Sequence, residues 1–302
     1  MKEIVFVGNP NVGKSAWINA LSNAHFAIGN WPGVTVEKKE AIVKWEEEYH
    51  LVDLPGFYSL YHPQNEEVIS ASYLKEHTPD LIVNVVDALN LRQSLHLTLM
   101  LRELQIPMVI ILNFYDQVEK FHLHIDVKRL KRRLQIPIIC GSAFDETSHQ
   151  QVKEAIHTYA NQIVCYYPLL NPKEEHLFME LLSRVKLHEP NRDVRTQFQT
   201  VIRILEGQTT IANDKILLDY QKQLGVWDEH RLHAIHQLMR YVDTETSEHL
   251  HFTKRFDKWL LHPLFGPVFF GMIAILFFII VFRGSAPWVQ FITYFIQDYR
   301  CV

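Results

Sequence analysis

Eight residues near the start of the chain have the types and the spacing of a phosphate-binding loop. The stretch Gly8-Asn9-Pro10-Asn11-Val12-Gly13-Lys14-Ser15 fits the pattern G-x-x-x-x-G-K-[ST]. It follows an apolar run and opens a helical pattern, which is the context that this motif requires. Glycines allow backbone N–H groups to converge on phosphate oxygens at a helix N-terminus. We expect Lys14 to reach the β- and γ-phosphates of a nucleotide and the Ser15 hydroxyl to ligate Mg²⁺.

A second motif, Asp53-Leu54-Pro55-Gly56, ends a predicted strand. The Asp53 carboxylate can hold the water shell of Mg²⁺, and the Gly56 amide can contact the γ-phosphate. Phe57 follows, and neither it nor Tyr58 offers a carboxamide to orient an attacking water. We therefore expect slow hydrolysis, with the water placed by backbone groups.

Two further motifs predict guanine as the base. Asn113-Phe114-Tyr115-Asp116 follows a predicted strand. The Asp116 carboxylate can accept both the ring N–H and the exocyclic amine of guanine, a donor pair that adenine lacks. Phe114 stands where GTPases usually have a lysine, and we expect its ring to pack on the base or on the loop. Gly141-Ser142-Ala143 matches the loop whose backbone amide meets the guanine oxygen.

Residues 29–37 read Gly29-Asn30-Trp31-Pro32-Gly33-Val34-Thr35-Val36-Glu37. Thr35 is placed to bring its hydroxyl and carbonyl to Mg²⁺ and the γ-phosphate. Two glycines and a proline suit a segment that orders only when the γ-phosphate is present. Together the motifs predict Mg²⁺ ligands at Ser15, Thr35 and Asp53. They predict nucleotide contacts from Gly8, Asn9, Pro10, Asn11, Val12, Gly13, Lys14, Ser15, Ala16, Gly33, Val34, Thr35, Asp53, Leu54, Pro55, Gly56, Asn113, Asp116, Ser142 and Ala143.

The elements that must position these motifs alternate between strands and helices over residues 1–165. Apolar runs predict strands at 3–7, 41–45, 50–53, 81–86, 108–112 and 136–140, with helical patterns near 14–22, 66–77, 92–104, 126–134 and 148–160. This alternation is typical of βαβ units. We predict an α/β fold of the P-loop GTPase (Ras-like) type, with a mostly parallel six-stranded sheet and helices on both faces. Residues 37–53 predict an antiparallel hairpin at one edge.

Beyond Pro168 and Pro172 the pattern becomes helical, with no strand-like run. We predict a GTP-binding domain at 1–165, a small all-α domain at 166–250, and a linker, a transmembrane helix and a tail at 251–302. The run 264–282 carries no charge and has the ~20-residue length that a helix needs to cross a bilayer. Cations flank it on both sides, with more before it than after it, so the positive-inside bias places the N-terminal part in the cytoplasm.

The overall composition excludes several classes of protein. The 302 residues are 48% hydrophobic and 21% charged, which is ordinary for globular proteins and excludes a mainly disordered or coiled-coil chain. The net charge of −4 argues against a dedicated nucleic-acid binder. We interpret the basic run 128–133 as a solvated helix face. His122 with His124, and His249 with His251, have no third ligand nearby in sequence, so we interpret them as surface histidines.

The sequence resembles the FeoB-type bacterial ferrous iron transporters. The resemblance rests on residues 8–15, on Asn30-Trp31-Pro32-Gly33-Val34-Thr35-Val36-Glu37, on the Asp53 motif with Tyr58-Ser59-Leu60 after it, and on Val86-Asp87-Ala88 followed by Asn90-Leu91-Arg92. It extends to the order of the predicted parts. The chain departs from the family at Phe114, usually Met, and at Phe57, usually Thr. It also departs in length, since full members carry many more membrane helices.

The resemblance implies a G protein tethered to a polytopic membrane domain that passes Fe²⁺ into the cytoplasm. It places the protein in the bacterial inner membrane with the N-terminal domains facing the cytoplasm. It implies that residues 166–250 act as a spacer and, like a GDP-dissociation inhibitor, stabilise bound GDP. It also implies activation by K⁺, or by another monovalent cation, with Asn11 as ligand, so the expected catalytic residues are Lys14, Thr35, Gly56 and Asn11.

The implied cofactors are GTP or GDP, Mg²⁺ and K⁺. The implied partners are guanine nucleotide, the remaining membrane domain, the lipid bilayer, small cytosolic Feo-type accessory proteins and a second copy of the chain, and not nucleic acid. Because one membrane helix cannot build a permeation path, we expect this chain by itself not to transport iron.

Other interpretations stay open. A soluble-type GTPase of RNA modification or ribosome assembly would share the phosphate loop, but it predicts a basic RNA-binding appendage. A nucleotide sensor with negligible hydrolysis is supported only by Phe57 and Phe114. An ATPase requires that Asp116 does not read guanine.

Overall fold

The computed structural model describes residues 1–23, 27–31, 37–64, 67–118, 120–121, 123–160, 162–208, 222–244 and 267–282. The chain divides into two compact units, Met1–Asp243 and Thr244–Val302. All of the motifs discussed above fall within the first unit.

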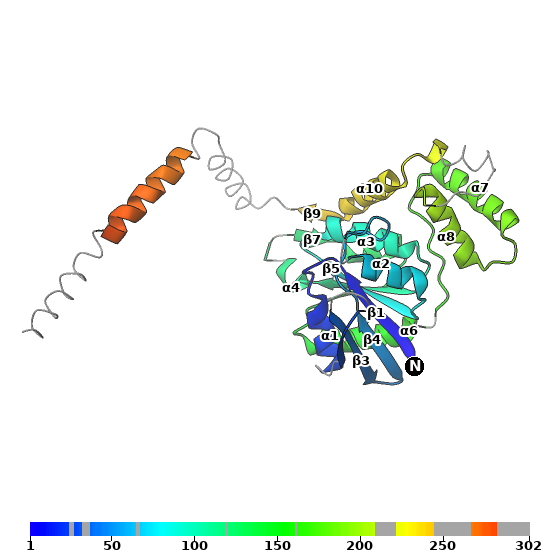
Figure 1. Ribbon diagram of the computed structural model, residues 1–302, viewed down its shortest axis with the longest axis horizontal. Coiled ribbons are helices and arrows are strands. Elements are labelled where there is room, and N and C mark those ends of the chain that lie inside the picture. Colours follow the sequence, from blue (N-terminus) through cyan, green and yellow to red (C-terminus); the bar gives the residue numbers. More distant parts are fainter. Residues whose placement is uncertain are drawn as a thin grey trace, which may run out of the picture. The chain divides into compact units, whose positions relative to one another are not determined.

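A seven-stranded sheet forms the centre of the first unit among the described residues (Figure 1), in the order β2-β3-β4-β1-β5-β6-β8. Parallel pairing joins β1 (Lys2–Gly8) to β4 (Glu48–Asp53) and to β5 (Leu81–Asp87), and continues through β6 (Met108–Asn113) to β8 (Ile138–Cys140). The carboxyl ends of β1, β4 and β6, where the predicted motifs begin, therefore lie at one edge of the sheet.

The predicted hairpin is confirmed, since β3 (Glu37–Lys44) pairs antiparallel with β4. The predicted number of six strands is wrong. A further strand, β2 (Ala27–Asn30), pairs antiparallel with β3 and takes the edge position that we expected for the hairpin. Its four residues include a glycine and an asparagine, which are depleted in strands, so composition gave no signal for it.

Helices cover both faces of the sheet because the strands alternate apolar side chains between two faces. In β1, Ile4 and Phe6 join the core formed with α1 (Lys14–Ser22) and α6 (Glu146–Tyr159). Val5 and Val7 join the core on the opposite face, to which the helices α2 (Glu67–Glu76), α3 (Leu91–Arg102) and α5 (Val127–Leu134) contribute. Burial on both faces explains why the central strands read as continuous apolar runs.

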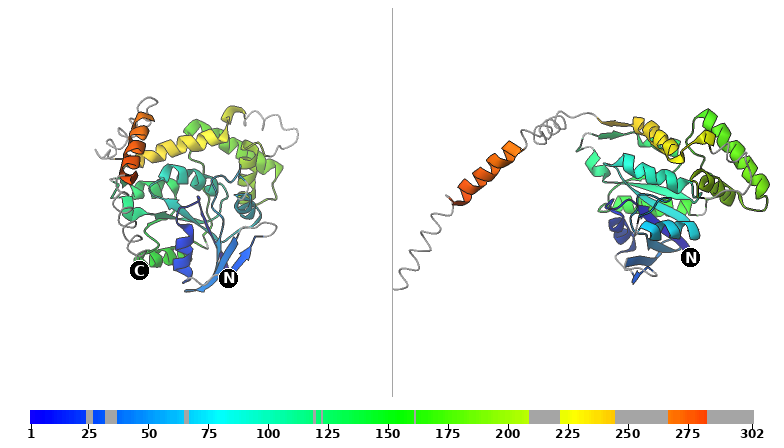
Figure 2. Two further views of the ribbon diagram at one scale, coloured as in Figure 1. Left: turned by 60° about the vertical axis from the view of Figure 1, so that its left-hand side comes forward. Right: turned by 45° about the horizontal axis from the view of Figure 1, so that its top comes forward.

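The described residues after 170 are mainly helical, as predicted. Helices α7 (Pro172–His188) and α8 (Val194–Leu205) pack on each other, and α10 (Trp227–Leu238) packs along α3 (Figure 2). Their buried side chains belong to the same core as one face of the sheet. The domain boundaries at 165 and 250 stay predictions.

One part of the helical prediction is wrong. After the short 3₁₀ helix η1 (Met239–Tyr241), the strand β9 (Val242–Thr244) pairs with β7 (Leu123–Ile125) in a second, two-stranded sheet. The N–H of Asp126 also donates to the Tyr241 carbonyl at 2.9 Å. A three-residue strand that forms only by pairing with a distant segment leaves no local pattern to read.

In the second unit, the described residues are a helix over 267–282 with mostly exposed apolar side chains. Among the described residues, no helix combines the length and apolarity needed to cross a membrane, so the prediction of a spanning helix over 264–282 is not confirmed. The described helix is shorter than the ~20 residues that a bilayer requires, and 264–266 lie outside the described residues.

The sequence also singles out the basic run 128–133 and two pairs of histidines. The basic side chains on α5 are exposed, while Leu130 and Leu134 turn into the core. No group of three or more potential metal ligands occurs among the described residues, and His122, His249 and His251 lie outside them.

Candidate nucleotide-binding site

The phosphate loop connects β1 to α1, as the motif predicts. Gly13 caps the helix with a φ of 84°, a left-handed conformation that favours glycine. A Cβ at Gly13 would lie 2.3 Å from Asn113 Nδ2, and one at Gly8 would lie 2.6 Å from the Val85 carbonyl oxygen. The two glycines therefore allow the loop backbone to lie directly against its neighbours.

Lys14 and Asp53 form a buried ion pair at the start of α1 and the end of β4. The Lys14 Nζ contacts Asp53 Oδ1, and the Ser15 hydroxyl donates to Asp53 Oδ2 at 3.2 Å. Burial, together with the nearby charge of Lys39, lowers the pKa of Lys14 to about 7. The structure thus brings together three of the groups predicted to handle phosphate and Mg²⁺.

The segment after Asp53 is held against the phosphate loop. The Phe57 N–H donates to the Gly8 carbonyl at 3.2 Å, and a Cβ at Gly56 would lie 2.8 Å from Pro10 Cα. The Ser70 hydroxyl of α2 donates to the Pro55 carbonyl at 2.7 Å. This close approach places Gly56 beside the loop, where its amide is predicted to meet the γ-phosphate.

Asn113 bridges the base motif to the phosphate loop. Its Nδ2 donates to the Val12 carbonyl at 2.9 Å, and its Oδ1 accepts from Trp17 Nε1 at 3.0 Å. Phe114 follows with a φ of 60°, and its ring edge would lie 3.4 Å from a Cβ at Gly13. The ring therefore packs towards the loop, which is one of the two positions that we predicted.

The other residues predicted to contact the guanine base lie on the connections that follow β6 and β8. Asp116 is exposed in the short helix α4 (Tyr115–Val118), directly after β6. Ser142 and Ala143 follow β8, and His149 of α6 hydrogen-bonds the Ala143 carbonyl at 2.8 Å. The exposed Asp116 carboxylate is accessible to a ligand, as the predicted role requires.

Several predicted residues lie outside the described residues, namely Gly33, Val34 and Thr35. Asn11 is exposed within the loop at a φ of 65°, and Asn9 is buried. Trp31, just before the undescribed segment, is buried and meets the Tyr73 ring edge-on at 5.3 Å.

The family comparison agrees with this geometry. A family described as Ferrous iron transport protein B matches residues 2–156 of the chain. The chain belongs to this family. The Fe(2+) transporter FeoB of Legionella pneumophila (strain Lens) is 30% identical over 301 residues, which cover 95% of this chain and 40% of that relative. The chain thus spans about two-fifths of the length of the curated relatives that it matches.

Solved FeoB structures share the fold. The cytosolic domain of L. pneumophila FeoB is 29% identical with a TM-score of 0.67, covering 80% of this chain and 99% of that one. A GDP-bound mutant of the S. thermophilus FeoB G-domain is 29% identical with a TM-score of 0.71 and the same coverage. The described α/β unit is therefore a FeoB G-domain followed by helices.

Sequence reasoning missed two contributors to this FeoB site. Glu67, the first residue of α2, accepts from the N–H groups of Tyr58 and Gln64, at 3.1 Å in each case. It thereby holds the segment that follows the Asp53 motif. Trp17 was also missed, because a tryptophan inside a helical pattern reads as an ordinary core residue.

Proposed function

We propose that this chain binds GTP with Mg²⁺ and hydrolyses it to GDP and phosphate, as the cytosolic G domain of a ferrous iron transporter. The observation that carries the proposal is the convergence of Lys14, Ser15, Asp53 and Gly56 at the phosphate loop. P-loop hydrolases use this combination of groups to hold phosphates and Mg²⁺. The GDP-bound S. thermophilus G-domain and the GMPPNP form of the T. maritima cytosolic domain support guanine as the base.

The donor set at the loop fits Mg²⁺. The Ser15 hydroxyl and the Asp53 carboxylate lie 3.2 Å apart, and oxygen donors of these two kinds are the ligands that Mg²⁺ prefers. A bound Mg²⁺ supplies charge neutralisation at the β- and γ-phosphate oxygens. Thr35 remains the proposed third protein ligand.

Asn11 is the proposed ligand for K⁺. It is exposed at the turn of the phosphate loop, where its amide oxygen is accessible to a monovalent cation beside a phosphate chain. Such a cation would add positive charge where negative charge develops during phosphoryl transfer.

The hydrolysis step relies on backbone groups in this proposal. Phe57 is fully buried and its N–H already donates to the Gly8 carbonyl, and its side chain carries no group that could orient a water. Tyr58 is 44% exposed and carries no carboxamide. Lys14 would hold the β- and γ-phosphates, and the Gly56 N–H would help to position the attacking water. The low number of dedicated groups supports a slow rate.

The transport role concerns a protein longer than this chain. We propose that the bound nucleotide orders residues 24–37 and 53–62, and that this order passes through residues 170–250 to a membrane domain that carries Fe²⁺. The proposed location is the bacterial inner membrane, with residues 1–250 on the cytoplasmic side. The length of the curated relatives and their name, Fe(2+) transporter, support this proposal.

Phosphate release from the purified chain tests the hydrolysis proposal. GTP and ATP are supplied separately, in K⁺ and in Na⁺. We expect turnover of GTP alone, faster in K⁺, with the gain from K⁺ lost in Asn11→Ala and the GTP preference lost in Asp116→Ala. Asn90→Ala, at another exposed asparagine, should behave like the parent chain. Equal turnover of ATP would contradict guanine reading by Asp116.

A nucleotide sensor with negligible hydrolysis is the second candidate, because Phe57 is buried and offers nothing to a water molecule. GTP binding without turnover in either salt would support it. A GTPase acting on RNA would instead use the exposed basic face of α5, and salt-sensitive RNA binding would identify it.

A further inference from the structure

Trp17 lies on α1, three residues beyond the lysine of the phosphate loop, and its side chain is fully buried. It sits in the core between the sheet and α6, together with Val109 and Ile111 of β6. Unlike these aliphatic neighbours, it carries an N–H group that needs a partner when buried. That partner is Asn113, 96 residues further along the chain.

The indole fixes which way the Asn113 amide points. Trp17 Nε1 can only donate, so the atom that faces it at 3.0 Å is the amide oxygen of Asn113. The Val12 carbonyl can only accept, so the amide nitrogen faces it at 2.9 Å. Both ends of the amide therefore have partners of a single kind, and a flipped amide would set donor against donor and acceptor against acceptor.

The indole also reaches the second loop predicted to contact the base, which contains Ala143. The Trp17 and His149 rings meet edge-on, with centroids 5.8 Å apart and an interplanar angle of 79°. His149 in turn hydrogen-bonds the Ala143 carbonyl at 2.8 Å. A Cβ at Gly141 would lie 3.6 Å from the indole, so the indole also borders the residue at which this loop begins.

We propose that Trp17 is a positioning residue for nucleotide retention. Its indole holds the phosphate loop, through Asn113, in register with the loop of Ala143, through His149. The inference rests on the proposed guanine nucleotide binding. It assigns no nucleotide contact to Trp17, which acts through Asn113 and His149. Loss of the indole N–H leaves the Asn113 oxygen buried without a donor, which favours other orientations of the amide and releases the Val12 carbonyl.

The test is the release rate of GDP carrying a fluorescent label on the ribose, measured with the whole chain. We expect Trp17→Phe, which keeps an aromatic ring and removes the N–H, to release GDP roughly tenfold faster. His149→Phe keeps the ring contact and removes the hydrogen bond to Ala143. We expect it to release GDP about threefold faster. Because His149 is only partly buried, this variant tests the contact with Ala143 without leaving a cavity in the core.

Tyr49→Phe is the matched control. Tyr49 is fully buried in the same core, and its hydroxyl hydrogen-bonds His157 Nδ1 at 2.9 Å. It pairs with Lys2 at the end of β1 opposite to Gly8. The substitution removes one aromatic hydrogen bond from the same core, far from the loops, and should leave GDP release unchanged.

A double-mutant cycle separates positioning from general loosening of the core. If Trp17 acts through the amide, Trp17→Phe should add nothing to the release rate of Asn113→Ala, whereas independent effects would multiply. Parent-like GDP release in Trp17→Phe, or equal acceleration by Tyr49→Phe, would overturn the inference. A parent chain that fails to retain GDP at all would instead overturn the proposed function.

Discussion

Two buried charge clusters in the first unit differ in how many side chains surround the cation. At the phosphate loop, Lys14 has the one carboxylate of Asp53 as its ion-pair partner among the described residues, and burial lowers the pKa of its ammonium. At the seam between α3 and α10, Arg231 contacts Glu103, Glu206 and Asp228. Burial acts to lower the pKa of its guanidinium, but the charges of Glu103 and Glu206 outweigh this effect and raise the pKa far above the ordinary value.

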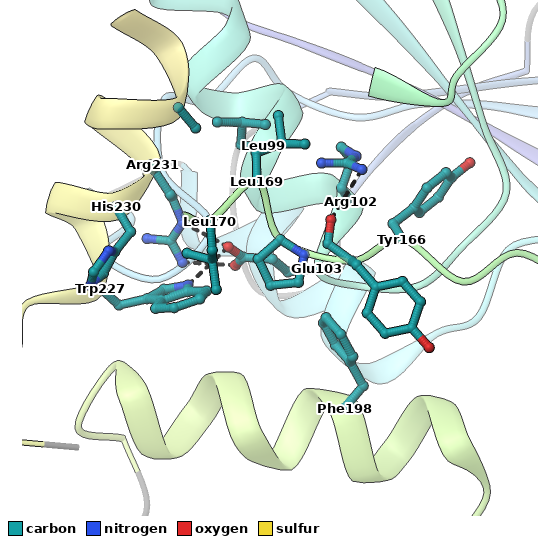
Figure 3. Close-up of a pocket in the computed structure, with 13 residues that line it drawn as sticks. Leu99, Arg102, Glu103, Tyr166, Leu169, Leu170, Phe198, Trp227, His230 and Arg231 are labelled. Carbon is teal, nitrogen blue, oxygen red and sulfur yellow. Dashed lines mark hydrogen bonds and ion pairs between the residues drawn. The ribbon is translucent and has the colours of Figure 1, made fainter. Parts of the chain in front are cut away.

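The geometry of the second cluster explains the difference (Figure 3). Arg231 donates through Nε and Nη2 to the two oxygens of Glu103, at 2.9 and 2.7 Å. Trp227 Nε1 donates to the same carboxylate at 3.0 Å. The guanidinium also lies 4.9 Å from the centre of the Tyr61 ring. Bidentate, charge-assisted bonds of this kind are strong and directional.

The two clusters therefore serve different ends. The seam cluster is held by side chains of the fold itself and lies beside a pocket lined by residues of α3, α8 and α10 and by residues 166–170 (Figure 3). At the phosphate loop the Lys14 cation has the Asp53 carboxylate and no other ion-pair partner among the described residues, and in the proposed function it would also meet phosphates. A buried cation with few partners and a lowered pKa is a feature of ligand sites, whereas a cation held by several carboxylates is typical of a structural ion-pair network.

The largest expected effect is on stability, from Arg231→Met. The substitution leaves Glu103 and Glu206 buried without their cation, which should lower the free energy of unfolding by about 3–5 kcal/mol. Urea denaturation measures the loss. Arg192→Met is the control, because Arg192 is exposed and pairs only loosely with Glu189, at 3.6 Å. A loss as small as that of the control would show that the seam is not a structural network.

Lys14→Met should have the reverse profile. We expect GDP and GTP affinity to fall at least ~100-fold, about 3 kcal/mol, because the phosphates lose their cation. The free energy of unfolding without nucleotide should fall by less than in Arg231→Met, because an ammonium is no longer buried and the Ser15 hydroxyl still donates to the one carboxylate left behind, Asp53. Nucleotide titration and urea denaturation measure the two quantities. A stability loss equal to that of Arg231→Met would erase the contrast between the clusters.

The pH dependence of the free energy of unfolding of Arg231→Met tests how Arg231 acts on the buried carboxylates. Burial raises the pKa of Glu206, and Arg231 opposes this rise in the parent chain. A carboxyl with a raised pKa in the folded state favours folding at low pH, and this contribution is lost as the pH rises through its folded pKa. The stability deficit of the variant should therefore be smaller at pH 4.5 than at pH 8, by about 1 kcal/mol. A deficit that grows on acidification would contradict this assignment.

The smallest effect is expected at the rim of the seam, from Asp228→Asn. Burial acts to raise the pKa of Asp228, but His96 and Arg231 outweigh it and hold the pKa below the usual range. Its side chain is 44% exposed, so solvent screens both pairs, and the free energy of unfolding should fall by at most about 1 kcal/mol. Thermal unfolding of Asp228→Asn, measured beside Arg231→Met, gives the ratio of the two stability losses. Comparable losses would place Asp228 at the centre of the network.

The residues identified from the sequence alone share one property: their roles follow from their positions within short, continuous motifs. The phosphate loop, the Asp53 motif and the Asn113 motif each begin where an apolar strand ends, and parallel strands bring their carboxyl ends together in this fold. The main strands and helices were predictable for the same reason, since periodicity of apolar residues is a local signal. These patterns also carried the family, which the comparisons confirmed.

Tertiary structure alone decided the contacts that hold these motifs in place. Trp17 with Asn113, and Arg231 with Glu103, are joined across 96 and 128 residues of chain. Neither pair carries a spacing that periodicity could reveal. The strand β9 likewise exists through pairing with a distant segment, β7, and the edge strand β2 exists through its pairing with β3. Local sequence thus determined which groups could do the chemistry, whereas packing between distant segments decided which of them are matched, buried and held in one orientation.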